Sequence, residues 1–346
     1  MTQLTINPEV ENPITMRELP ETLLMHFRTN EPVMLSGDSG IGKTMGVHQA
    51  CDMDGRKMFT FQTNISEPVD ARGCPVPNME TRTTDWFVPN NLPKSDGSDG
   101  PSTLFIDEIN TGSVMMMAVL MQLVVWPRKL GDYQLPDNCR VVAAGNRRKD
   151  SKAVHDMPKP LKTRFVNYTV VVDYDVFDEY AAASGLAPEI RAFVKFRKAA
   201  GVLLRQPVGD EWAYANPRSI VKCGKYVHEK PSLRVKAFIG SVGRDVGTEM
   251  EGFVSMYQSF TTIETILKDP DNAPVPSEPS HIYGVAAALS NIADRKTFRN
   301  VMAYAKRLPP DIGNMCVLTA AERDKKLTSV VGFSEWSTDT HAQLGV

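Results

Sequence analysis

A glycine-rich octapeptide near the amino end decides most about the fold of this chain. Its sequence is Gly37-Asp38-Ser39-Gly40-Ile41-Gly42-Lys43-Thr44, and it follows a short apolar run at residues 33–35. It fits the pattern G-x-x-x-x-G-K-[ST], in which glycines let the backbone turn tightly and aim N–H groups at phosphate oxygens. A helix can follow from Lys43 to about Met53, with its positive amino end facing the same phosphates. Strand, loop and helix in this order predict a phosphate-binding loop (P-loop, or Walker A motif), with Lys43 on the β- and γ-phosphates and Thr44 on Mg²⁺.

An acidic pair follows a second apolar run. Leu104-Phe105-Ile106 ends in Asp107 and Glu108, which is the Walker B pattern. We expect Asp107 to hold the Mg²⁺ shell through water, and Glu108 to orient and activate an attacking water. The adjacent glutamate favours a hydrolase over a nucleotide sensor or a kinase. The simpler alternative is a strand that ends in two solvated acids.

The pattern of apolar runs predicts the fold class. Strands are expected at residues 33–35, 58–62, 103–106, 141–144 and 166–172. Short apolar strands joined by longer crossovers indicate a parallel sheet that is buried on both faces. After Asp173 helical patterns dominate, at residues 188–200, 217–229, 246–267, 282–293 and 295–308. We therefore predict an α/β chain with an amino-terminal segment at 1–30, a nucleotide-binding core at 31–174 and a helical region at 175–346.

The order of these motifs resembles that of AAA+ ATPases, and within them the MoxR branch with its CbbQ-like activases and phage MoxR-like ATPases. The resemblance is specific over residues 31–220 and only general beyond. It implies a P-loop parallel sheet sandwiched by helices, followed by an all-helical lid. It also implies Mg²⁺-dependent ATP hydrolysis at the subunit interfaces of a ring, expected to be a hexamer.

The resemblance assigns roles to three further residues. Val141-Val142-Ala143-Ala144-Gly145-Asn146 resembles the sensor 1 strand, so Asn146 would help to position the water. Leu161-Lys162-Thr163-Arg164-Phe165 resembles the arginine-finger segment, although Thr163 stands where many relatives carry Asp. Arg164 would then reach the γ-phosphate in the neighbouring subunit, and Arg147 and Arg148 are rival candidates for that role. The simpler readings are a strand-capping Asn and a surface ion pair.

Sensor 2 and two surface features complete the resemblance. Ala215-Asn216-Pro217-Arg218-Ser219-Ile220 looks like sensor 2, with Arg218 reaching from the lid to the nucleotide of its own subunit. An insert at residues 66–93 and a hairpin at 128–135, turning at Gly131-Asp132, resemble features that would face a pore or one side of the ring. The alternatives are an ordinary arginine at a helix start and plain surface loops.

Composition limits the other functions. Hydrophobic residues make up 42% and charged residues 23%, which suits an ordinary folded chain, and the net charge of −2 argues against bulk electrostatic binding of nucleic acid. The five cysteines are scattered, so we expect free thiols in a reducing compartment rather than a metal site. No apolar run approaches the roughly 20 residues of a membrane span, and no secretory signal is evident. The expected location is the cytoplasm, or the host cytoplasm if the chain is viral.

Three functional hypotheses remain open on the sequence. The first is an ATP-driven ring that remodels a partner protein or complex, as MoxR-like chaperones do, often with a partner that bears a von Willebrand factor A domain. The second is a nucleic-acid motor or helicase loader, which would use the same nucleotide residues. The third is a ring that binds ATP only to assemble as a scaffold. Residues 309–346 give no functional signal.

Overall fold

The computed structural model describes residues 11–147, 155–198, 201–204, 211–258 and 260–337. The chain divides into two compact units, Met1–Val176 and Phe177–Val346. The boundary predicted after residue 174 lies close to this division.

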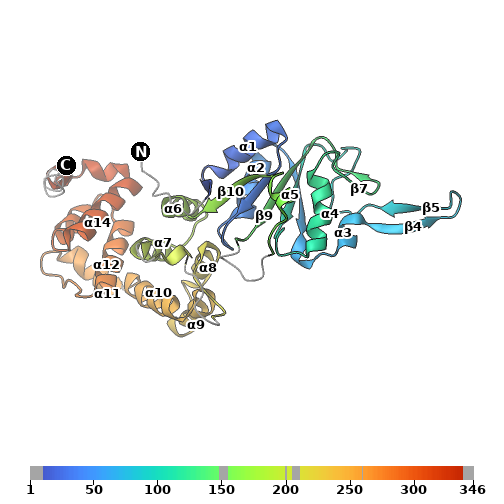
Figure 1. The fold of residues 1–346 in the computed structure, drawn as a ribbon. Helices are drawn as coiled ribbons and strands as arrows, with labels where there is room; N and C mark the ends of the chain where they lie inside the picture. The colour runs from blue at the N-terminus through green and yellow to red at the C-terminus, as the bar shows by residue number, and fades with distance from the viewer. Residues whose placement is uncertain (1–10, 148–154, 199–200, 205–210, 259, 338–346) are drawn as a thin grey trace. The chain divides into compact units, whose positions relative to one another are not determined.

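The first unit is built on one six-stranded sheet in the order β1-β10-β2-β9-β6-β3, with every neighbouring pair parallel. The sheet confirms the predicted parallel α/β fold (Figure 1). β9 pairs with both β2 and β6, so the strand before the P-loop and the strand before the acidic pair are separated by a single strand. The strands are β1 Pro13–Thr15, β2 Val33–Ser36, β3 Lys57–Gln62, β6 Ser102–Asp107, β9 Cys139–Gly145 and β10 Val166–Val171.

Side chains alternate between the two faces of this sheet, as the period of a strand requires. Val33 and Leu35 of β2 join one apolar cluster, and Met34 joins the other. Helices α1 (Leu19–Thr29) and α2 (Lys43–Met53) contribute to the first cluster, and α4 (Val114–Val124) to the second. Figure 1 shows α1 and α2 side by side, with α4 across the sheet from them. Both faces are therefore covered, which explains the apolar runs of the central strands β2, β6 and β9.

The amino-terminal segment, predicted at 1–30 as separate from the core, is part of the first unit. β1 extends the sheet by pairing with β10, and α1 buries Leu19, Leu23 and Phe27 in the cluster shared with α2. Gly46 of α2 allows this packing, because a Cβ there would lie 2.4 Å from Leu19 Cδ2. A three-residue strand that begins with proline has too short a pattern to be recognised from sequence.

Two antiparallel hairpins leave this core. β7 (Lys129–Leu130) and β8 (Tyr133–Gln134) form the predicted hairpin, which turns at Gly131 with φ 61°. The predicted insert contains a short helix, α3 (Pro68–Arg72), and a second hairpin that was not expected, between β4 (Cys74–Asn78) and β5 (Thr83–Phe87). This hairpin extends away from the sheet (Figure 1). Whether either hairpin faces a pore stays a prediction.

The second unit is helical, as predicted for the carboxyl half. The predicted helix at 246–267 is two helices, and α9 and α14 were not foreseen. One apolar cluster of this unit includes Ile266, Leu289, Phe298 and Val317 from four different helices. The helices are α6 Tyr174–Ala183 at the division, then α7 Pro188–Phe196, α8 Pro217–Cys223, α9 Pro231–Val242, α10 Arg244–Tyr257, α11 Phe260–Lys268, α12 Pro279–Ile292, α13 Phe298–Ala305 and α14 Pro310–Arg323.

All five cysteines are free thiols, and four of them are buried. Burial raises the pKa of the Cys223 and Cys316 thiols to about 12, so both stay protonated at neutral pH. Within the described ranges, no helix is both long and apolar enough to cross a membrane.

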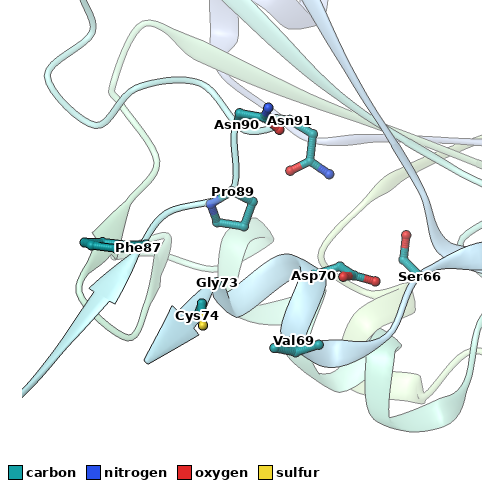
Figure 2. A pocket seen from close by; sticks show the side chains of 9 residues that line it. All are labelled: Ser66, Val69, Asp70, Gly73, Cys74, Phe87, Pro89, Asn90 and Asn91. Carbon is teal, nitrogen blue, oxygen red and sulfur yellow. The ribbon is translucent and has the colours of Figure 1, made fainter. Parts of the chain in front are cut away.

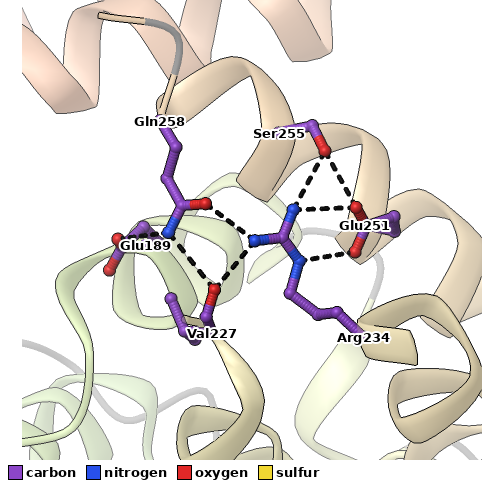
Figure 3. A network of polar contacts seen from close by, with 6 residues as sticks. All are labelled: Glu189, Val227, Arg234, Glu251, Ser255 and Gln258. Carbon is purple, nitrogen blue, oxygen red and sulfur yellow. Dashed lines mark hydrogen bonds and ion pairs between the residues drawn. The ribbon is translucent and has the colours of Figure 1, made fainter. Parts of the chain in front are cut away.

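A buried arginine joins α9 to α10 in the helical unit (Figure 3). The Arg234 side chain is only 3% exposed, and its guanidinium donates to both carboxylate oxygens of Glu251 at 2.7 and 2.8 Å. Its other N–H groups donate to Val227 O at 2.8 Å, Gln258 Oε1 at 2.7 Å and Ser255 Oγ at 3.1 Å. All five donors of the guanidinium are thus used inside the protein.

Replacing Arg234 by alanine is expected to lower the free energy of unfolding of the helical unit by about 3–5 kcal/mol, because Glu251, whose side chain is only 13% exposed, then loses its charged partner. Urea denaturation followed by circular dichroism measures this change. Arg299→Ala is the matched control, since Arg299 is exposed on α13, and we expect a change within about 0.5 kcal/mol. Equal, small losses for both variants would contradict a structural role for the Arg234 network.

Candidate nucleotide-binding site

The P-loop joins the carboxyl end of β2 to the amino end of α2. Three of its glycines have positive φ angles, 151° at Gly37, 77° at Gly40 and 105° at Gly42. A Cβ on Gly37 would lie 2.7 Å from Val170 O in the neighbouring strand β10. Glycine at these positions is therefore required both by the backbone conformation and, at Gly37, by the close approach of β10.

Lys43, the first residue of α2, is folded into this loop. Its Nζ donates to the carbonyl oxygens of Gly37 and Asp38, both at 2.8 Å, and to Asn146 Oδ1 at 3.3 Å. The residue is only 8% exposed. A buried ammonium needs such acceptors because desolvation of the charge is costly. The loop therefore holds a positive charge at the point where the sequence predicts phosphates.

The end of β6 has an unusual backbone at Glu108, whose φ is 55°. Glu108 N donates to Asp107 Oδ1 at 3.0 Å, and Glu108 O accepts from Thr111 N at 2.9 Å. Thr63, at the end of β3, donates through its hydroxyl to Asp107 O at 3.1 Å and also to Glu108 O. A left-handed glutamate costs about 1–3 kcal/mol, and such strained residues cluster at functional sites.

Asn146 connects the two motifs. Its Nδ2 donates to Glu108 Oε2 at 2.9 Å, while its Oδ1 accepts from Lys43 Nζ at 3.3 Å. It follows the last residue of β9, the strand between β2 and β6, so its amide lies between the P-loop and the acidic pair. One carboxamide thus joins the lysine and the glutamate, at the position where the sequence predicts sensor 1.

The geometry fits a nucleoside triphosphate with Mg²⁺. Among the described residues no side chain caps the amino end of α2, so its backbone N–H groups can meet phosphate oxygens. Thr44 lies in the first turn of that helix. Asp107 ends β6, which is separated from β2 by one strand of the sheet, so these two residues would hold Mg²⁺. No group of three or more His, Cys, Asp or Glu among the described residues could hold a metal. A magnesium ion at this site would therefore take most of its ligands from phosphate and water.

Of the two rival arginines after sensor 1, Arg147 lies within the described residues and contacts the P-loop. Arg147 Nη2 donates to Asp38 Oδ2 at 3.1 Å, so it pairs with the P-loop of its own chain. This contact favours a role within one subunit over the predicted alternative of action on a neighbour. Arg148 lies outside the described residues.

Arg164 lies near the amino ends of the parallel strands, whereas the P-loop follows the carboxyl end of β2. This arginine lies between α5 (Lys159–Lys162) and β10, two residues before Val166, which begins β10 and is in register with Val33 at the start of β2. The P-loop leaves the other end of β2, about 13 Å away at 3.3 Å per residue. Arg164 is exposed, and its guanidinium donates to Pro160 O. Any contact of Arg164 with a P-loop phosphate would therefore involve a second copy of the chain.

Arg218 belongs to the helical unit. Asn216 caps α8 by accepting from Ser219 N at 2.9 Å, and Pro217 and Arg218 form the first turn, where the arginine is exposed. This local geometry is the predicted one, and the action of Arg218 on the nucleotide stays a prediction.

Three polar residues of the site were missed by sequence reasoning: Thr63, Asn110 and Thr111. Thr63 and Thr111 hold the backbone of Glu108, and Asn110 is bonded to the backbone of Asn146. The sequence signal for them was weak: Asn110 and Thr111 are polar residues soon after the acidic pair, and Thr63 is a polar residue that follows β3. The contacts of Thr63 and Asn110 depend on strand order, which local patterns do not give, whereas Thr111 contacts Glu108 only three residues before it.

A surface cavity of about 450 Å³ lies elsewhere, at the base of the β4–β5 hairpin (Figure 2). Val69 of α3, Phe87 of β5 and Pro89 line it, together with Asn91. Phe87 is 66% exposed, which is high for a large apolar side chain. None of the P-loop or acidic-pair residues lines this cavity.

Comparisons with known proteins give only distant likenesses. No protein-family model matches the chain, and no curated protein matches it significantly. Among solved structures, it is similar to a Cytophaga hutchinsonii protein assigned as an ATPase, with 15% identity over 87% of this chain and 80% of that one and a TM-score of 0.36. A point mutant of Thermotoga maritima RuvB gives 14% identity over 74% and 76%, with a TM-score of 0.38. Brucella abortus NtrX in complex with ADP gives 13% over 95% and 68%, with a TM-score of 0.35. Since all three scores are below 0.5, the case for a function depends on the geometry of the chain itself.

Proposed function

We propose that this chain is a Mg²⁺-dependent ATP hydrolase of the AAA+ type. The observation that supports this most strongly is the contact of the Asn146 carboxamide with both Lys43 and Glu108, at 3.3 and 2.9 Å. A phosphate-binding lysine and a carboxylate that can activate water are thereby held together at the carboxyl edge of one parallel sheet. This is the arrangement that attack of water on a terminal phosphate requires.

Each residue has a distinct part in the proposed reaction. Lys43 and the N–H groups of the P-loop bind the phosphates, with the lysine exchanging its loop carbonyls for phosphate oxygens. Glu108 accepts a proton from the attacking water. The oxygen of that water forms a bond to the γ-phosphorus, and the bond between the γ-phosphorus and the β-phosphate oxygen breaks, giving ADP and phosphate. Asn146 keeps Glu108 and the water in line. Mg²⁺, when bound by Thr44 and Asp107, would neutralise charge on the β- and γ-phosphates.

We further propose that the active site is completed by a second subunit. Arg164 is exposed and lies at the sheet edge away from its own P-loop, a position that suits contact with the nucleotide of a neighbour. Arginine fits this part because it stays charged and binds phosphate through two donors. Arg218 would act on the nucleotide of its own subunit.

The proposed biological role is remodelling of a partner protein or complex, as in the MoxR branch. The hairpin β4–β5 offers a contact surface for such a partner, because Met79 and Phe87 are 85% and 66% exposed. A partner with a von Willebrand factor A domain and a hexameric ring are expectations from the resemblance. DNA-stimulated hydrolysis that is lost at high salt would favour a nucleic-acid motor instead.

Lys43→Ala tests the nucleotide site. We expect it to weaken the affinity for a fluorescent ATP analogue by about 10- to 100-fold, since a charge-assisted hydrogen bond contributes roughly 1.5–3 kcal/mol. Lys57→Ala is the control, because Lys57 is exposed and pairs with Asp99 on the surface at 2.8 Å. An unchanged affinity in Lys43→Ala would contradict binding of the triphosphate in the P-loop.

A further inference from the structure

A second asparagine, Asn110, holds the backbone of Asn146 from both sides. Asn110 Nδ2 donates to Asn146 O at 2.6 Å, and Asn146 N donates to Asn110 Oδ1 at 3.2 Å. Both residues are buried, with 8% and 9% of their surface exposed. One carboxamide therefore satisfies the donor and the acceptor of one peptide residue, in the way that a neighbouring strand would.

This pairing extends the sheet beyond the end of its strands. β6 and β9 pair up to Ile106 and Ala143, and Ile109 N then donates to Ala144 O at 2.9 Å. The Asn110 carboxamide forms the next hydrogen bonds along β9, with the backbone N–H and carbonyl of Asn146. The backbone at Asn110 adds a further contact, since its carbonyl accepts from His155 N at 2.8 Å. Asn110 is thus bonded to two residues of the connection between β9 and α5, Asn146 and His155.

Gly145 provides an independent sign that the pairing is built into the fold. A Cβ at Gly145 would lie 2.4 Å from Asn110 Oδ1 and 2.9 Å from its Cγ. These distances are far below van der Waals contact, so the Asn110 carboxamide can approach the end of β9 only because residue 145 has no side chain.

We propose that Asn110 is a positioning residue for ATP hydrolysis, which acts by fixing Asn146 against Glu108 and Lys43. The inference rests on the proposed function. The Asn146 side chain meets two groups at once, and its reach depends on where its own backbone is held. Loss of the Asn110 carboxamide frees that backbone and lets the amide move off Glu108. A displacement of about 1 Å in such an arrangement can lower a rate by about 10²-fold.

The test compares turnover with nucleotide affinity. We expect Asn110→Ala to lower kcat by about 10- to 100-fold, while the Kd for the ATP analogue changes by less than about twofold because the P-loop is intact. Asn110→Asp keeps the acceptor for Asn146 N but places a carboxylate oxygen against Asn146 O in a buried site, so its kcat should also fall below that of the wild type. The matched control is Asn138→Ala, which removes a half-buried carboxamide that donates to Gly97 O and Gly100 O before β9.

Gly145→Ala gives a second route to the same result. It should lower kcat by displacing the Asn110 carboxamide, and it should add little to the defect of Asn110→Ala, since the displaced group is then already absent. Multiplied defects in the double variant would contradict the inference.

Three further outcomes overturn the proposal. Asn110→Ala with the kcat of the wild type shows that the carboxamide does not position Asn146. A parallel loss of kcat, affinity and urea midpoint shows a structural role only. A wild-type chain that binds ATP without turnover overturns the proposed function, and this inference with it, whereas an active wild type with an unaffected Asn110→Ala overturns the inference alone.

Discussion

Arg164→Ala is expected to lower kcat for ATP hydrolysis by about 10³–10⁵-fold, the range known for arginines that act on a transferring phosphate from a second protein. Arg164 is exposed and lies at the sheet edge opposite its own P-loop. Its loss should therefore leave nucleotide binding to each chain nearly unchanged. Phosphate release and the Kd of a fluorescent ATP analogue, measured on the same preparation, separate these effects. Arg299→Ala, at an exposed arginine of α13, should keep full activity.

A mixing experiment shows whether Arg164 acts between subunits. Arg164→Ala and Glu108→Gln chains are each expected to be nearly inactive alone. When they are mixed, an intact Glu108 from the first variant can meet an intact Arg164 from the second. Activity should then return to a substantial fraction of that of the wild type. A mixture as inactive as its components, although exchange of subunits is demonstrated by a labelled chain, would mean that Arg164 does not act on a neighbour.

Glu108→Gln has the second largest expected effect, a fall in kcat of about 10²–10⁴-fold. The glutamine keeps an oxygen that can accept from Asn146 Nδ2, a bond of 2.9 Å in the wild type, so the site should keep its shape. It cannot take a proton from water, so hydrolysis stops while ATP binding continues. Phosphate release under single-turnover conditions measures the loss.

Asp85→Asn, at a solvent-exposed acid on β5, is the control for this variant, and we expect it to hydrolyse ATP at the rate of the wild type. If Glu108→Gln hydrolyses ATP as fast as the wild type, another group activates the water. If it loses nucleotide binding together with turnover, the glutamate has a binding role and not the catalytic one proposed.

Local motifs explain what the sequence could predict. The octapeptide at 37–44 fixes its own loop through its glycines, and helix α2 begins and ends where the pattern indicates, at Lys43 and Met53. The five predicted strands are present, and the signal is strongest in β2, β6 and β9, whose apolar runs are buried on both faces of the sheet. The acidic pair at the end of β6 follows from the same signal.

Non-local contacts explain what the sequence could not predict. The bonds of Thr63 to Glu108 and of Asn110 to Asn146 exist because β3, β6 and β9 are neighbours in the sheet, although they are far apart along the chain. The β4–β5 hairpin was missed because β4 is short, contains Pro75 and Pro77, and has no buried residue, so it lacks the apolar pattern of a strand. β1 is too short to leave a pattern.

The particle mass of Glu108→Gln with and without ATP and Mg²⁺ tests the central claim most directly, since this variant should bind ATP and keep it. Light scattering at saturating nucleotide, with saturation verified by the fluorescent analogue, gives the mass. We predict a shift to a closed oligomer that binds one ATP per chain. A particle that remains a 38.3 kDa monomer with ATP bound would contradict an active site shared between subunits.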